Sequence, residues 1–163
     1  MLHKEYESFT VEYPLFPFLN RSVTVHFVYG YSAELNGENR TYLGESLYWN
    51  DIIFIQLQAK QFGPPCNVVI DNTTANIKHT LMHEITHQVE GVIYGNNFLQ
   101  NDHERVPVIL AAWGELIVKA TNDIMELYAP LRAEHDKERR TKKQMALQQE
   151  LAVQIEEIGK HES

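Results

Sequence analysis

The part of the sequence best suited to chemistry is a histidine pair with a glutamate between its members. Residues 79–92 read HTLMHEITHQVEGV, which sets His83, Glu84 and His87 at the spacing His-Glu-x-x-His. Residues four apart share one face of a helix, so the two imidazoles are spaced to bind one ion. Glu84, turned by one residue, can reach a water on that ion as a general base. We therefore predict a Zn²⁺ site with His83 and His87 as ligands and Glu84 as the catalytic residue.

The hydrophobic pattern places this motif on a helix of roughly five turns that begins near residue 73. Asn72, Thr73 or Thr74 can cap its start, and Gly95 can end it. Apolar residues recur at three- and four-residue steps, at Ile77, Leu81, Ile85, Val89 and Val92. On a helical wheel the two histidines lie nearly opposite the apolar group, so they do not belong to the core stripe.

The elements around this helix indicate an α+β fold. Strand-like stretches precede it at residues 22–30, 41–49 and 52–58, with a turn signal at Asn36-Gly37 and a brief strand at residues 68–70. They predict a small antiparallel sheet. A second helix is expected from about Glu104, with Pro107 in its first turn. After Pro130 the composition becomes strongly charged, which predicts a helical tail over residues 131–163 and a main domain over residues 1–130.

Composition and charge restrict the class of protein and its partners. The net charge is -8, and the excess negative charge lies within residues 1–130, which is unfavourable for binding nucleic acid. No apolar run is long enough to span a bilayer, so no membrane association is expected. No secretion signal is recognisable, and the single cysteine, Cys66, cannot form an internal disulfide. We expect a cytoplasmic protein.

The uncharged frame of the motif, TLMHEITHQV at residues 80–89, resembles the extended signature of the zincin metallopeptidases. The close match covers ten residues, and a wider resemblance of sheet, motif helix and second helix covers roughly residues 20–125. The chain also looks like small phage or mobile-element peptidases of the ImmA/IrrE-like and SprT-like groups. The resemblance implies a minimal zincin in which His83 and His87 bind zinc and Glu84 acts as the base.

A catalytic zinc site needs a third protein ligand. The metzincin continuation is absent, because Glu90 and Ile93 stand where its glycine and histidine would be. The start of the second helix offers the alternatives. We prefer Glu104, because Glu104 to Ala111 resembles the ligand helix of glutamate-type zincins. His103 is the main alternative, since it lies nearer the apolar stripe of that helix, and Asp102 and Glu115 follow.

Other residues are candidates for supporting roles. His79 and Glu90 lie one turn from the histidine ligands and can orient them, although a solvent-exposed role is the simpler interpretation. Tyr94, His103 or Tyr128 can stabilise a developing oxyanion. The strand at residues 52–58, or the one before it, can form a sheet edge that holds an extended peptide by backbone pairing.

The expected function is zinc-dependent hydrolysis of a protein or peptide substrate, with a zinc-bound water activated by Glu84. Two alternatives belong to other classes. One is a binding protein that keeps the metal only for stability. The other is an interaction protein that acts through the helical tail, where Leu147, Leu151, Ile155 and Ile158 allow self-association.

Overall fold

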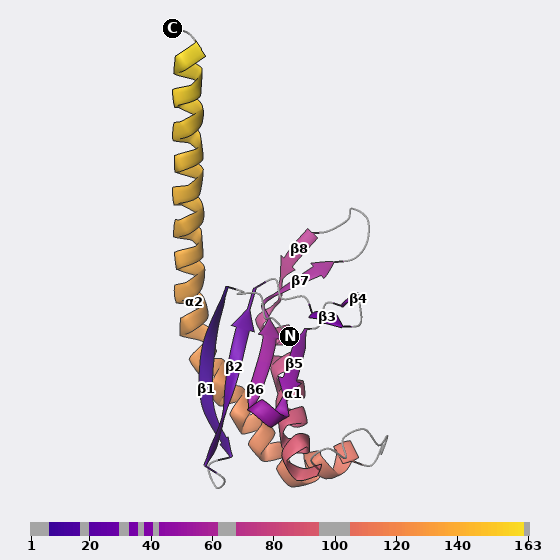
Figure 1. Ribbon diagram of the computed structural model, residues 1–163. Coiled ribbons are helices and arrows are strands. Elements are labelled where there is room, and N and C mark those ends of the chain that lie inside the picture. Colours follow the sequence, from indigo (N-terminus) through magenta and orange to yellow (C-terminus); the bar gives the residue numbers. More distant parts are fainter. Residues whose placement is uncertain are drawn as a thin grey trace. The chain divides into compact units, whose positions relative to one another are not determined.

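The computed structural model describes residues 7–16, 20–29, 33–35, 38–40, 43–61, 68–94 and 105–161. The fold is α+β, as predicted: strands occupy the first part of the chain, and two helices follow them (Figure 1). The chain divides into two compact units, Met1–Leu127 and Tyr128–Ser163. The domain boundary predicted at residue 130 stays a prediction.

The central sheet has four strands in the order β1-β2-β6-β5 (Figure 1). These are β1 (Ser8–Phe16), β2 (Arg21–Val28), β6 (Ile52–Gln56) and β5 (Gly44–Leu47). The pairs β1–β2 and β5–β6 are antiparallel, but β2 and β6 run parallel. The predicted all-antiparallel sheet is therefore wrong, and the sheet is mixed.

The parallel pair arises from the path of the chain after β2. A 3-10 turn at Tyr48–Asn50 reverses the chain after β5 and brings β6 between β5 and β2. Asp51 adopts a left-handed conformation at this point, with φ of 54°. Its carboxylate accepts two hydrogen bonds from Arg21, at 2.5 and 3.1 Å, and its carbonyl accepts one from Thr24 at 2.8 Å. The nearly continuous apolar sequence IIFIQ suits such a central strand: Ile53 and Ile55 are fully buried, and Ile52 and Phe54 are half-buried.

Two short antiparallel ribbons complete the strands. One pairs β3 (Ala33–Leu35) with β4 (Glu38–Arg40), and the expected Asn36-Gly37 turn between them lies outside the described residues. The other pairs β7 (Gln58–Gln61) with β8 (Val68–Asp71), so the brief strand expected at residues 68–70 is confirmed.

Helix α1 (Thr74–Tyr94) carries the His-Glu-x-x-His motif, as predicted. The backbone N–H of Asn76 donates to the Thr73 hydroxyl at 3.2 Å, which identifies Thr73 as the residue that caps the helix. The predicted core stripe is buried except for Val92, which is half-buried; its buried members are Ile77, Leu81, Ile85 and Val89. This stripe packs α1 against β5 and β6. The end of the helix expected at Gly95 lies outside the described residues.

Helix α2 (Arg105–His161) is a single helix of 57 residues. The separate second helix and tail that the sequence predicted are therefore continuous, and Pro130 lies inside the helix rather than at a break. An internal proline removes one backbone hydrogen bond, a cost that the flanking turns of a long helix can offset. Pro107 is the third residue, in the first turn as expected. No helix in the described part of the chain is long and apolar enough to cross a membrane.

The first part of α2 belongs to the same compact unit as the sheet. Its buried residues in this unit recur at helical spacing: Ile109, Ile117, Ala120, Thr121 and Ile124. The Tyr13 hydroxyl on β1 donates a 2.6 Å hydrogen bond to the Asp123 carboxylate on α2. Burial of Tyr13 raises the pKa of its hydroxyl, and the hydrogen bond to Asp123 raises it further. This hydrogen bond connects α2 to β1, which lies at the opposite edge of the sheet from β5.

Candidate metal and catalytic site

The two motif histidines converge on one point. His83 Nε2 and His87 Nε2 lie 3.0 Å apart, and the two rings are nearly perpendicular, at 89°. Two ligands of a tetrahedral zinc ion, each about 2.05 Å from the metal, are about 3.3 Å apart. The observed separation is close to this value. The imidazole pair therefore fits one Zn²⁺ ion, although without metal the same approach also allows one ring to donate a hydrogen bond to the other.

The surroundings of the two rings favour metal binding. Loss of part of its hydration lowers the pKa of the His83 ring, and the neighbouring His87 and His79 lower it further, which favours the neutral form that binds metal. His87 Nδ1 lies 3.4 Å from the Glu90 carboxylate. A proton on this nitrogen leaves Nε2 free to accept a metal, which is how outer carboxylates orient histidine ligands. Glu90 thus occupies the place expected of a supporting residue.

Glu84 differs from the histidines beside it because its side chain points into the protein. It is 6% exposed, whereas His83 is exposed and His87 half-buried. Burial raises the pKa of the Glu84 carboxyl to about 7, and the negative charge of Glu45 on β5 adds to this rise. A carboxyl with a pKa near neutrality is suited to accept a proton and then return it.

Strand β5 forms the boundary of the site on the sheet side. It is the last strand in the sheet order, and it packs against α1. Its first residue, Gly44, lies beside Glu84 and Thr80 on α1. The predicted edge strand at residues 52–58 is wrong for β6, which is central, but the strand before it, β5, is at the edge.

The three candidates for a third zinc ligand at the start of the second helix are not among the side chains that the structure describes. Glu104, His103 and Asp102 lie outside the described residues, so the preference for Glu104 stays a prediction. In the described part of the chain, no three side chains of histidine, cysteine, aspartate or glutamate gather closely enough to hold a metal. Of the predicted oxyanion donors, Tyr94 is half-buried at the end of α1 and Tyr128 is buried on α2.

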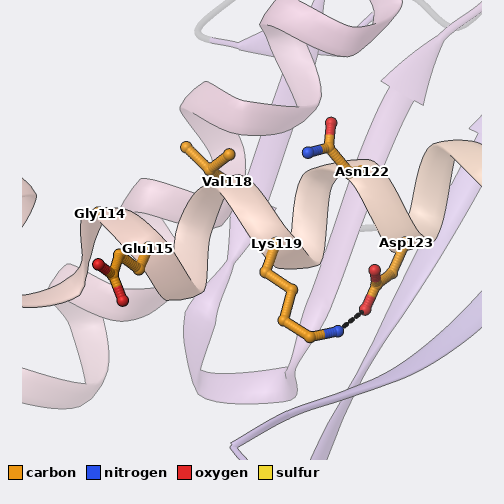
Figure 2. Close-up of a pocket in the computed structure, with 6 residues that line it drawn as sticks. All are labelled: Gly114, Glu115, Val118, Lys119, Asn122 and Asp123. Carbon is orange, nitrogen blue, oxygen red and sulfur yellow. Dashed lines mark hydrogen bonds and ion pairs between the residues drawn. The ribbon is translucent and has the colours of Figure 1, made fainter.

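Glu115, the remaining ligand candidate, is exposed on α2 and lines a shallow groove on that helix (Figure 2). The groove is bordered by Gly114, Glu115, Val118, Lys119, Asn122 and Asp123. Its one ion pair joins Lys119 to Asp123, one turn apart on the helix (Figure 2). All of these residues come from a single helix, and the lining contains no histidine or cysteine. The groove therefore lacks the chemistry of the histidine site.

Sequence reasoning missed two residues near the motif. Gln88 is fully buried, and its side-chain N–H donates to the Ile52 carbonyl at 3.0 Å, which connects α1 to β6. Its position, seven residues after Leu81 and three after Ile85, lies on the apolar side of the helical wheel, so the pattern that predicts the core stripe also indicates its burial. Gly44 was also missed, but an isolated glycine within a predicted strand is a recognised sign of close backbone approach, and that sign was present in YLGESL.

Comparisons of the chain with protein family models, curated proteins and solved structures find no match.

Proposed function

We propose that this protein is a zinc-dependent metallopeptidase of the zincin type, with His83 and His87 as zinc ligands and Glu84 as the general base. The observation that carries the proposal is the combination of converging imidazoles, 3.0 Å apart, with a buried carboxyl one residue away whose pKa is raised to about 7. A metal held only for stability needs no carboxyl of this kind beside its ligands.

The roles of the residues follow from their positions. A bound Zn²⁺ lowers the pKa of a coordinated water and polarises the scissile carbonyl. The Glu84 carboxylate accepts a proton from the attacking water and delivers it to the leaving amine. Glu90 keeps a proton on His87 Nδ1, so that Nε2 faces the metal position.

The substrate that best suits this arrangement is an extended peptide. Within the described residues, β5 pairs with β6 on one side and with no strand on the other. A peptide added at this edge would form backbone hydrogen bonds and lie beside the start of the strand, where Glu84 approaches. Side-chain preference would then come from pockets around β5, while the backbone pairing itself tolerates many sequences.

The experiment that tests the proposal measures zinc content and peptide hydrolysis together. Purified wild-type protein and His83→Ala are analysed by elemental mass spectrometry and incubated with a quenched fluorescent peptide library. Wild-type protein should hold close to one zinc per chain and cleave peptides, and the variant should lose both. A wild type that holds no zinc after reconstitution would overturn the proposal, and zinc without hydrolysis would favour a structural metal.

The third ligand is tested by two variants at the start of α2. Glu104→Ala should lower zinc content strongly, while His103→Ala should retain it, because we propose Glu104 as the ligand. The reverse result would assign His103. Equal retention in both variants would exclude this pair and direct attention to Asp102 and Glu115.

One observation favours a second candidate function, self-association through the end of α2. Large apolar side chains there are 49–68% exposed: Met145, Leu147, Leu151, Val153 and Ile155. An exposed apolar group of this kind often marks a protein contact. Light scattering of wild type and a Leu147→Gln/Leu151→Gln variant separates the candidates. A dimer that becomes monomeric with unchanged hydrolysis would show that the helix serves assembly.

A further inference from the structure

Gly44 occupies a position where β5 passes close to Glu84. A Cβ atom built on Gly44 would lie 2.9 Å from Glu84 Cγ, 2.9 Å from Glu84 Oε1 and 2.6 Å from Thr80 Cγ2. Real Cβ atoms essentially never come within 3.0 Å of such neighbours, so any side chain would force them to move. The backbone of Gly44 is not in the left-handed region. The missing side chain, and not a special turn, is therefore what the position requires.

The side chains of the sheet show why this space is left open. Across the sheet, Gly44 pairs with Ile55, Ile55 with Phe27, and Phe27 with Phe9. Phe27 and Ile55 are fully buried, and Phe27 stacks on Phe9 with ring centres 5.2 Å apart. This row of large side chains ends at glycine on β5. The volume that a fourth side chain would fill is occupied by the side chains of Thr80 and Glu84 from α1.

We propose that Gly44 is a positioning residue that sets the location of the Glu84 carboxyl, and so determines whether the base can reach the reacting water. The inference rests on the proposed function, because it assigns Glu84 a catalytic task. Glu84 lies on a helix whose backbone is fixed by its buried stripe, so a Cβ at position 44 leaves the carboxyl only side-chain rotations by which to move away. Those rotations would carry Oε1 off its present position by about 0.5 Å or more to restore ordinary contact distances.

The first part of the test compares Gly44→Ala with wild type. The variant should keep its zinc, because the ligands are His83 and His87 and neither appears among the nearest atoms to the new Cβ. Its kcat should fall by about tenfold or more, since small displacements of a reacting group have large effects on rate, while KM changes little. Gly114→Ala is the matched control, because a Cβ at Gly114 meets nothing within 4 Å. It should leave zinc, kcat and KM unchanged.

The second part uses thermal unfolding of the metal-free protein and does not depend on activity. Gly44→Ala is made in wild type and in Glu84→Ala, which lacks Cγ and Oε1. If the new methyl group collides with the carboxyl, the loss of melting temperature caused by Gly44→Ala should be smaller in the Glu84→Ala background. Equal losses in both backgrounds would show that position 44 and Glu84 do not interact, and would overturn the proposal.

If Gly44→Ala does not fold, a second substitution at Thr80 keeps the proposal testable. Thr80→Ser removes the Cγ2 atom that makes the closest contact, so Gly44→Ala/Thr80→Ser should fold, and it is compared with Thr80→Ser. If the double variant folds but its kcat is still reduced, the result would support the proposal that position 44 affects kcat through the Glu84 carboxyl. Full kcat in this double variant would overturn it.

The two proposals fail in different ways. Wild-type protein that holds zinc but hydrolyses nothing would overturn the proposed function, and the unfolding experiment would still decide whether Gly44 and Glu84 interact. An active wild type with an equally active Gly44→Ala variant would overturn the role of Gly44 alone.

Discussion

Helix α1 and the end of α2 depart from the usual burial pattern in opposite directions. In α1, two polar side chains are buried: Glu84 is 6% exposed and Gln88 is fully covered. Near the end of α2, apolar side chains are exposed, with Leu147 at 59% and Ile155 at 68%. Proteins generally bury apolar groups and keep polar groups in contact with water.

The contrast shows that side chains which depart from the usual burial pattern do so for different physical reasons. The side-chain N–H of Gln88 is compensated by a hydrogen bond to the Ile52 carbonyl, whereas its buried Oε1 has no partner among the described residues. Glu84 carries a carboxyl whose pKa is raised by burial, a property that suits a reaction and costs stability. The exposed residues of α2 cost no hydrogen bonds but leave apolar area in water.

The largest effect should come from Glu84→Gln. Glutamine has nearly the same shape but cannot accept the proton, so hydrolysis should fall by about 10²–10⁴-fold. Zinc content should equal that of wild type, because we propose Glu84 as the base and not as a ligand. Rates from a fluorescent peptide and zinc content by mass spectrometry measure the two quantities. Loss of zinc in this variant would mean that Glu84 has been given the wrong role.

Ile85→Ala should have the next largest effect. Ile85 is fully buried on the face of α1 that packs on the sheet, so its truncation should lower the free energy of unfolding by about 2–5 kcal/mol. Chemical denaturation of both proteins provides the measurement. A change below about 1 kcal/mol would mean that the packing of α1 contributes far less than its burial indicates.

The buried carboxyl should give the metal-free protein a distinct pH dependence. The pKa of Glu84 rises from its ordinary value of 4.5 to about 7 on folding. The folded state therefore holds the proton more tightly, and its stability falls as pH rises from about 4.5 to 7. Glu84→Gln removes this loss. The variant should match wild type below pH 4 and exceed it by about 1–3 kcal/mol above pH 8.

Denaturation curves with a chelator present, measured across this pH range, test the prediction. The lowered pKa of His83 has the opposite sign, because its contribution to stability is lost as pH falls. Both proteins contain His83, so the difference between them isolates Glu84. A difference that does not change with pH would contradict the raised pKa.

The smallest effect should come from Leu151→Ala. Leu151 is 49% exposed on α2, so its truncation should change the free energy of unfolding by less than about 0.5 kcal/mol in dilute protein. The comparison with Ile85→Ala is direct, since both are aliphatic residues within helices. If Leu151→Ala destabilises by several kcal/mol and the effect grows with protein concentration, the end of α2 is buried in an assembly.

Local patterns in the sequence predicted α1 well. The stripe that includes Leu81 and Ile85 is buried, the cap is Thr73, and the two histidines share the other side of the helix. These features depend on residues within one or two turns, so helical periodicity is sufficient to find them. The proposed zinc ligands His83 and His87 are brought together for the same reason.

Features that depend on distant segments were not predictable in this way. The parallel pairing of β2 with β6 depends on where the chain returns after β5, and the burial of Glu84 depends on β5 passing over α1. The continuation of α2 through Pro130 was also missed, because a proline ends most helices but is tolerated in some long ones. Tertiary context decides each of these outcomes, and a single sequence contains no direct signal for it.

The central place of β6 also has a consequence for how the protein folds. β5 and β6 are joined by one short turn, so this hairpin can form rapidly from neighbouring residues. The parallel partners Thr24 and Ile52 are 28 positions apart, and closing that loop is slower. We expect pulse-labelling hydrogen exchange to protect β6 amides that face β5 before those that face β2. Strand β5, which borders the proposed active site, would then already be paired with β6 before the sheet is complete.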